Sequence, residues 1–357
     1  MTDTAAEQPK GLLHRIFRTS LVVIPIGVLG NIVFSLLVTD QSVLRSVAGF
    51  PKDYLFLALV LAFIPWLTNS LRLLIWTHFL GYRLRLRETF QLTLVNDLGS
   101  AVSPTAVGGG FFKWGMLVQR GVTPGAAASL TTLPIIEDGI FFALAIPTAV
   151  VITASWELPV FVWVADELQS NALFAVIAFG AVAALTWAAV RLVLGGGLGS
   201  RVRRTGLNFL AGTRRKTRAM WRDARTVFSL IRDRGKWRFA LSMSLTAIQW
   251  IARYSVISAL VAFLGAPVQP VLFWMFQWVV FTLMAFIPTP GAAGGAEAAF
   301  LLIYSAFLPE RIIGLATAGW RFLTFYLQLG LAAAIFSLLN LGNRSERDTA
   351  DETAPRT

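Results

Sequence analysis

The sequence predicts an all-α membrane protein, a polytopic bundle of about seven to eight transmembrane helices with two further re-entrant or broken helical segments related by an internal repeat. Of its 357 residues, 56% are hydrophobic and 14% are charged, whereas a soluble domain has roughly 25% charged residues. Apolar runs recur from residue 21 to residue 341 and leave no segment that would build a separate aqueous core. These observations exclude a soluble enzyme.

Seven apolar stretches are long enough to cross the roughly 30 Å of membrane hydrocarbon, which requires about 20 helical residues. The first is expected to be an anchor rather than a cleaved signal peptide, because it lacks a small-residue cleavage pattern and many spans follow it. The predicted spans are residues 21–38, 55–80, 126–154, 172–194, 239–264, 271–287 and 312–339.

These spans predict one membrane domain in which a basic loop separates two halves. Segment 201–238 holds 13 of the 31 Lys and Arg residues and only two acids, so the net charge of +12 belongs mainly to this loop and does not indicate nucleic-acid binding. Loops this basic stay in the cytoplasm, which predicts a multi-pass protein of the inner (cytoplasmic) membrane with a cytoplasmic N-terminus. The predicted segments are an N-terminal tail 1–20, a membrane domain 21–341 with halves 21–194 and 239–341 around the loop 195–238, and a C-terminal tail 342–357.

Two apolar segments, 90–117 and 288–307, are interrupted by Pro and clustered Gly and are predicted to be broken or re-entrant helices. The first contains SPTAVGGG (103–110) and the second TPGAAGG (289–295), and each places a Gly pair four and five residues after a Pro. Paired segments of this kind in two halves point to a transporter binding site near the membrane midplane. The alternative is that the small residues only allow close helix packing, as in inert bundles. The residues predicted to break the helices are Pro104, Gly108, Gly109, Pro290, Gly294 and Gly295.

Eight ionisable residues fall inside or at the edges of apolar segments, where a central charge costs about 2.5–3.5 kcal/mol. Four are acidic and four are basic, so one interpretation is a set of interhelical salt bridges, and Arg72 and Arg253 are also within reach of a membrane interface. The other interpretation is a polar track for substrate, in which one of the adjacent acids Glu137 and Asp138 carries a proton and Glu297 accepts an N–H at a half-helix start. The predicted substrate-binding residues are Lys113, Glu137, Asp138, Glu297, Arg321 and Arg72, and the other two charges are Asp97 and Arg253.

The residue inventory excludes several kinds of site. The chain has no Cys and only two His, which excludes disulfides, thiolate nucleophiles, Cys-ligated metals and His clusters. No residue pattern indicates a catalytic nucleophile. We therefore predict no catalytic residue, no metal and no cofactor.

The motifs around these residues resemble the membrane domain of the lysylphosphatidylglycerol synthase/flippase family, also called flippase-like integral membrane proteins. The resemblance covers roughly residues 20–340. It implies that the protein moves a polar-headed lipid between leaflets. It implies no aminoacylation, because the synthase activity of that family resides in an additional soluble domain. The motifs that carry it are LRLLIW (71–76), SPTAVGGGFFKWGM (103–116), GVTPGAAAS (121–129), GAAGGAE (291–297) and WRFLTFYLQ (320–328).

The leading functional prediction is therefore a flippase or lipid transporter with a polar intramembrane cavity, which is not an enzyme. Its partners are membrane lipids. The chain departs from the family pattern in ways that imply a different lipid head group, at Gly110, Phe112, Lys113, Asp138 and Ala296. One alternative is an intramembrane enzyme acting on lipid-linked sugars or phosphates, with Glu297 or Glu137 as general base. Another is a non-transporting scaffold that anchors envelope lipid-modifying enzymes through the basic loop. The oligomeric state is left open.

Overall fold

The computed structural model describes residues 49–103, 108–157, 229–231, 233–285, 287 and 289–339, and every regular element within these ranges is helical. The all-α class is therefore confirmed. The predicted features that lie outside the described residues are the spans 21–38 and 172–194, Pro104, the basic loop up to residue 228 and both tails.

Four long apolar helices match predicted spans. Each has 28 or 30 residues, which at 1.5 Å per residue gives about 42–45 Å, more than the hydrocarbon thickness. The fourth is interrupted near its middle by one π-helical turn, η5 (Phe322–Tyr326). The four are α3 (Lys52–Phe79), α6 (Pro124–Thr153), α10 (Lys236–Phe263) and Glu310–Leu339, whose first part is α13 (Glu310–Arg321).

Shorter helices form two hairpins. In the first, α4 (Leu86–Val102) packs against α5 (Gly108–Gln119). In the second, α11 (Pro270–Met284) packs against α12 (Gly295–Tyr304), with the short 3-10 turn η4 (Pro290–Ala292) between them. A further 3-10 turn, η3 (Ser155–Glu157), follows α6. The breaks predicted in segments 90–117 and 288–307 are confirmed.

The prediction of a full span at 271–287 is wrong in length. Helix α11 has only 15 residues, about 22 Å, and ends at Met284. The residues described between α11 and η4, Ala285, Ile287 and Thr289, are not helical. Because hydropathy is high throughout this segment, composition alone gave no sign that the helix stops early. Helix α11 is the first arm of the second hairpin and not an independent span.

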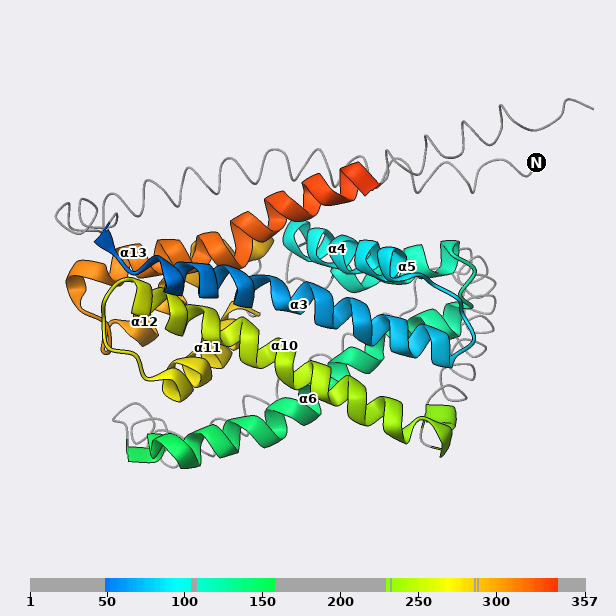
Figure 1. The fold of residues 1–357 in the computed structure, drawn as a ribbon, viewed down its shortest axis with the longest axis horizontal. Coiled ribbons are helices and arrows are strands. Elements are labelled where there is room, and N and C mark those ends of the chain that lie inside the picture. The colour runs from blue at the N-terminus through cyan, green and yellow to red at the C-terminus, as the bar shows by residue number, and fades with distance from the viewer. Residues whose placement is uncertain are drawn as a thin grey trace, which may run out of the picture.

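The elements repeat with inverted direction. The order long helix, hairpin, long helix occurs as α3, α4–α5, α6 and again as α10, α11–α12, α13. Figure 1 shows α3 and the helix that begins with α13 running from left to right, whereas α6 and α10 run from right to left. The first hairpin starts and ends at the right of this view and the second at the left. This is the inverted-topology repeat found in many transporter folds.

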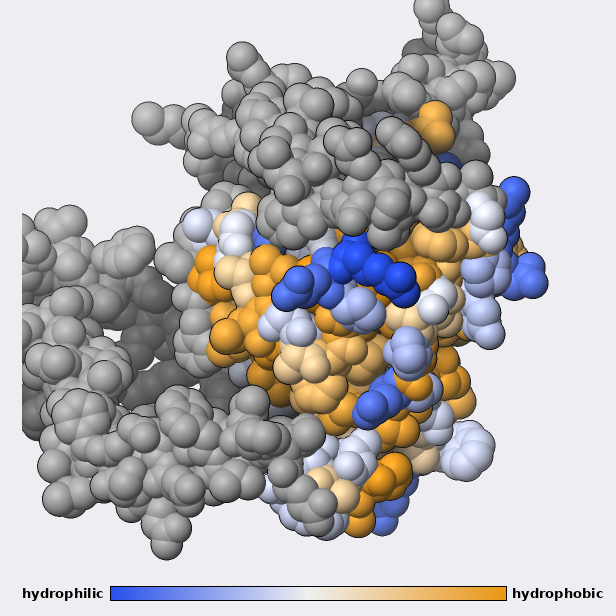
Figure 2. All heavy atoms as spheres, turned by 90° about the vertical axis from the view of Figure 1, so that its left-hand side faces the viewer, coloured by the Kyte–Doolittle hydropathy of each residue, from blue (hydrophilic) through white to orange (hydrophobic). Residues whose placement is uncertain are grey.

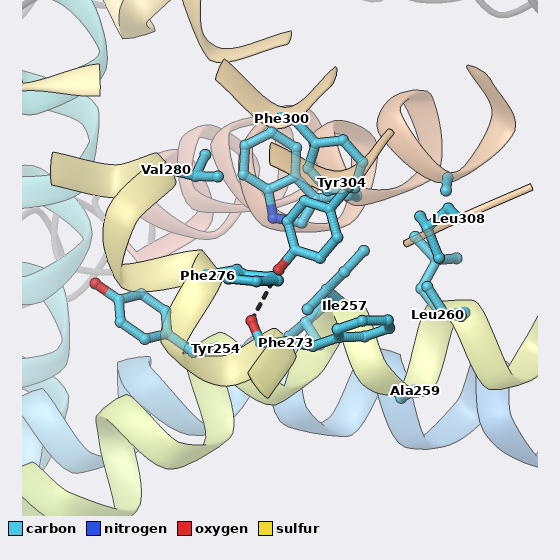
Figure 3. Packing of buried hydrophobic residues seen from close by; sticks show 14 of the residues in the cluster. Tyr254, Ile257, Ala259, Leu260, Phe273, Phe276, Val280, Phe300, Tyr304 and Leu308 are labelled. Carbon is cyan, nitrogen blue, oxygen red and sulfur yellow. Dashed lines mark hydrogen bonds between the residues drawn. The ribbon is translucent and has the colours of Figure 1, made fainter. Parts of the chain in front are cut away.

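The two halves are joined by a continuous apolar core. Helices α3 and α10 have the most extensive contact between elements in the described chain. Around them, Ile257, Phe273, Phe300 and Tyr304 are buried in one cluster, seen in Figure 3. The Tyr304 hydroxyl donates to the Phe273 carbonyl oxygen at 2.8 Å, and Gln277 Nε2 donates to the Tyr304 hydroxyl oxygen at 3.0 Å. These bonds fasten α12 to α11.

The outer surface is that of a membrane protein. Large apolar side chains are exposed along the long helices, for example Leu144 (67%) and Ile152 (65%) on α6. Figure 2 views the end of the bundle drawn at the left of Figure 1, where hydrophilic residues lie among apolar ones. Exposed charged residues begin α3 and α13 at that end, including Lys52 and Glu310. This distribution fits an apolar belt bounded by a polar rim.

The first hairpin depends on a close approach between α4 and α5. A Cβ atom at Gly109 would meet the Asn96 backbone carbonyl and the Ser100 hydroxyl, while one at Gly115, on the same helix, would meet nothing within 4 Å. A backbone carbonyl cannot move aside without disturbing its helix. The predicted glycine at position 109 is therefore needed for packing.

Replacing Gly109 with alanine (Gly109→Ala) is expected to lower the free energy of unfolding by about 1–3 kcal/mol through overpacking. The matched control Gly115→Ala should be neutral or stabilising by up to about 1 kcal/mol, because alanine favours helix at an open position. Chemical unfolding of the purified protein in detergent, followed by tryptophan fluorescence, measures both. Equal effects of the two substitutions would contradict the close approach.

Candidate functional site

The first charged cluster joins α3 to α6. Arg72 lies within α3 and is 1% exposed, and Glu137 of α6 is fully buried. The Arg72 guanidinium donates to Glu137 Oε2 through Nε at 3.0 Å and through Nη2 at 2.6 Å. Its Nη1 donates to Asp138 Oδ1 at 3.2 Å, and the Asp138 side chain keeps 25% exposure. Arg72 is therefore buried within the bundle and does not extend to a membrane interface. Its guanidinium forms ion pairs with both predicted acids.

Polar side chains of α3 and α10 complete this cluster. Gln249 Oε1 of α10 accepts from Arg72 Nη1 at 3.0 Å. Trp76 Nε1 lies 3.1 Å from both Glu137 Oε1 and the Ser242 hydroxyl oxygen. Both Glu137 oxygens thus have donors, as a buried carboxylate requires. Sequence reasoning missed these partners, although a Gln within the apolar α10 was a usable signal.

The second charged cluster holds the second hairpin. Glu297, in the first turn of α12, accepts the Gly294 backbone N–H at 2.9 Å through Oε2 and Arg321 Nε at 3.0 Å through Oε1. The half-helix start predicted for Glu297 is confirmed. Arg321 also donates from Nη2 to the Gly291 carbonyl oxygen, and its guanidinium lies 4.2 Å from the Phe325 ring centroid. Arg321 thus links α13 to both the hairpin bend and α12.

The backbone around this cluster is irregular where the sequence predicted breaks. Gly291 (φ 61°) and Gly294 (φ 80°) adopt positive φ, which glycine tolerates at no steric cost. Gly295 begins α12 and Pro290 begins η4. Arg321 directly precedes the π-helical turn η5, and such turns are frequent at functional sites.

Two further predicted charges, Asp97 and Lys113, lie on the two helices of the first hairpin. Lys113 of α5 interacts electrostatically with Asp97, with Asp138 and with the Arg72–Glu137 pair. Within the described residues it makes no hydrogen bond or ion pair. Asp97 of α4 accepts Trp66 Nε1 at 2.9 Å. Lys113 therefore faces the first cluster without being neutralised by direct contact.

The structure brings the six predicted binding residues together in two groups. Arg72, Glu137, Asp138 and Lys113 belong to one group, and Glu297 with Arg321 forms the other. No hydrogen bond or ion pair joins the two groups in the part of the chain that the structure describes. The hairpins themselves do meet, because η4 contacts α4. Gly108 and Gly109, which were predicted to break a helix, are the first two residues of α5.

An open apolar groove of about 420 Å³ lies between α6, α10 and α11. Its α6 wall includes Phe141, Ala145 and Ala149, which stand three, seven and eleven residues after Asp138. Residues at this spacing share one face of a helix. The groove therefore starts one turn from the partly exposed Asp138 carboxylate. Within the described residues, no three His, Cys, Asp or Glu side chains are placed to hold a metal ion.

The fold and these charged clusters define a polytopic α-helical membrane protein built from an inverted repeat, with one broken hairpin and buried ion pairs in each half. The chain belongs to the family described as the lysylphosphatidylglycerol synthase TM region, whose model matches residues 20–332. This confirms the resemblance found in the motifs. The chain is also similar to a UPF0104 membrane protein of Archaeoglobus fulgidus, with 22% identity over 334 residues, which cover 88% of this chain and 97% of that relative.

Proposed function

We propose that this protein is a flippase or lipid transporter that moves a polar-headed phospholipid or lipid-linked molecule between the leaflets of the cytoplasmic membrane. The head group follows the polar residues between the halves while the acyl chains remain in apolar surroundings. No covalent bond is made or broken, so the protein acts as a transporter and not as an enzyme. Membrane lipids are its partners, and its N-terminus lies in the cytoplasm.

The observation that carries the proposal is the meeting of two broken hairpins that enter the bundle from opposite ends. The bend of the second hairpin, η4, contacts α4 of the first, and Figure 1 shows that each hairpin returns to the end where it entered. Transporters with inverted repeats place their substrate sites where such segments meet. Irregular backbone at this depth also requires protein or a polar cavity around it.

The distribution of polar and apolar groups supports a lipid as substrate. Asp138 is 25% exposed although it lies within the long helix α6, and Lys113 has no direct ionic partner in the described chain. The apolar groove begins one turn beyond Asp138. A polar head group beside Asp138 and Lys113 would thus be continuous with a surface that accepts an acyl chain.

The two ion pairs have a different role in this proposal. Arg72–Glu137 is buried, and in Glu297–Arg321 only Glu297 keeps exposure, 15%. These pairs hold the helices that frame the path. The substrate contacts Lys113 and the exposed part of Asp138, which also accepts from Arg72. The departures from the family pattern at positions 113 and 138 then fall on the residues that contact the head group.

Reconstitution in liposomes with fluorescently labelled lipids tests this function. We expect transbilayer movement faster than in empty liposomes for at least one anionic, zwitterionic or aminoacylated phospholipid. Asp138→Asn should slow transbilayer movement about tenfold, which corresponds to the loss of a contact worth about 1.4 kcal/mol. The control Asp53→Asn, at the exposed start of α3, should leave the rate unchanged. Movement no faster than in protein-free vesicles for every lipid class would overturn the proposal.

A further inference from the structure

Three hydrogen-bond donors near the middle of the described bundle have no acceptor. Arg253 Nε and Trp250 Nε1, both on α10, are buried and make no hydrogen bond. The Lys113 ammonium of α5 makes no hydrogen bond or ion pair within the described residues. Buried donors without partners are rare in folded proteins, and each calls for an explanation such as a bound ion or ligand.

The three donors share charged neighbours. Trp250 and Arg253 are one helical turn apart, and the Arg253 guanidinium lies 5.8 Å from the Trp250 ring centroid. Arg253 and Lys113 both interact electrostatically with Asp97. Lys113 and Trp250 both approach Asp138, although the indole N–H does not reach hydrogen-bond geometry with it. Helices α4, α5, α6 and α10 therefore all contribute to this region.

The carboxylates beside these donors already have partners. Asp97 accepts Trp66 Nε1 at 2.9 Å and Asn96 Nδ2 at 3.4 Å. Asp138 accepts Arg72 Nη1 at 3.2 Å. Neither carboxylate forms a direct ion pair with Lys113 or Arg253. The carboxylates in this region thus have donors, whereas the three donors have no acceptor. Because two of the donors, Lys113 and Arg253, are cationic, an anionic acceptor is the group that would satisfy them.

We propose that Lys113, Trp250 and Arg253 form a binding site for a phosphate group, with a phospholipid head group as its source. The source rests on the proposed function, whereas the phosphate chemistry rests on the unpaired donors alone. A phosphate offers several oxygens at tetrahedral angles and accepts from donors that arrive from different helices, and arginine binds it through more than one N–H. The Arg253 guanidinium contacts the rings of both Trp250 and Phe281, and these contacts fix its position. It lies 5.3 Å from the Phe281 ring centroid.

The site can be tested by ligand-induced stabilisation of the full-length, delipidated protein in detergent. The probes are dioleoylphosphatidylglycerol, the neutral dioleoylglycerol, glycerol 3-phosphate and inorganic phosphate. We expect a concentration-dependent rise in melting temperature with phosphatidylglycerol and none with dioleoylglycerol. Equal stabilisation by the neutral lipid would overturn the site. Equal stabilisation by glycerol 3-phosphate or inorganic phosphate would support the phosphate chemistry and overturn the lipid source.

Variants separate the site from general lipid binding. Arg253→Gln should weaken phosphatidylglycerol binding about tenfold because it removes a charge-assisted contact. Trp250→Phe keeps an aromatic side chain but removes the indole N–H, and should weaken binding less. Asp97→Asn should strengthen binding, because it removes a negative charge near both cations, an effect that misfolding cannot produce. Arg311→Gln, at the exposed start of α13, is the control. Wild-type affinity in Arg253→Gln and Trp250→Phe would overturn the proposal.

The liposome assay keeps this inference distinct from the proposed function. Phosphatidylglycerol binding that depends on Arg253, together with no transbilayer movement, would support the site and overturn the flippase. Transbilayer movement that is unchanged in Arg253→Gln and equally fast for lipids without phosphate would support the flippase and overturn the site.

Discussion

Arg72→Met is expected to lower the free energy of unfolding by about 3–5 kcal/mol, the cost of leaving a buried carboxylate without its partner. Glu137 is fully buried and receives two of its three donors from Arg72. Asp138 loses the same guanidinium, so two adjacent acids would remain in an apolar surrounding. The measurement is chemical unfolding of the purified protein in detergent, followed by far-ultraviolet circular dichroism.

Two further variants separate the effect of losing an arginine charge from the effect of leaving a buried acid unpaired. Arg83→Met, on the exposed connection between α3 and α4, removes the same charge at the surface and should change stability by less than about 0.5 kcal/mol. Arg72→Met combined with Glu137→Leu should recover most of the loss, because replacing a whole buried pair by apolar residues is often neutral. Failure of the double variant to recover would mean that the loss comes from the other partners of Arg72, Asp138 and Gln249, and not from the Glu137 carboxylate.

Arg321→Met is expected to release the second hairpin from α13. Arg321 donates to the Glu297 carboxylate and to the Gly291 carbonyl oxygen, so its removal frees both the half-helix start and the hairpin bend. Glu297 is 15% exposed, so the loss should lie near the lower end of the range for buried pairs, about 3 kcal/mol. The effect is expected to be local to η4 and α12.

Cysteine labelling can measure this release because the chain contains no cysteine. Ala296 on α12 is fully buried, so a thiol introduced by Ala296→Cys reacts with a permeant maleimide only when the hairpin opens. Adding Arg321→Met should raise the labelling rate about 100-fold, which corresponds to about 3 kcal/mol. Arg311→Met on the same helix, at an exposed position, should leave the rate unchanged. An unchanged rate in Arg321→Met would show that Arg321 does not hold the hairpin.

Much of the fold could be predicted because membrane helices are encoded locally. Apolar runs located α3, α6, α10 and the last long helix to within a few residues. Pro and Gly clusters located both helix breaks, since these residues remove backbone hydrogen bonds or allow positive φ wherever they occur. The early end of α11 was not predicted, because apolar residues continue past Met284.

The candidate site was predictable only as a set of residue types. The eight intramembrane charges stood out because each is costly in hydrocarbon, and their balance allowed complete pairing. Which charge pairs with which was not encoded locally, because Arg72 and Glu137 are 65 residues apart and Gln249 is 177 residues from Arg72. The sequence therefore did not show that Arg72 binds two acids while Arg253 and Lys113 form no ion pair with any residue that the structure describes.

Composition, apolar run length and the positions of Pro and Gly were sufficient to establish an all-α membrane protein with two related halves, because the hydrocarbon acts on each segment separately. The direction of the halves, the contact between η4 and α4 and the division of the charges into paired and unpaired groups emerged only in the folded chain. These features depend on distances between segments far apart in sequence. Electrostatic and hydrogen-bond energies fall steeply with such distances.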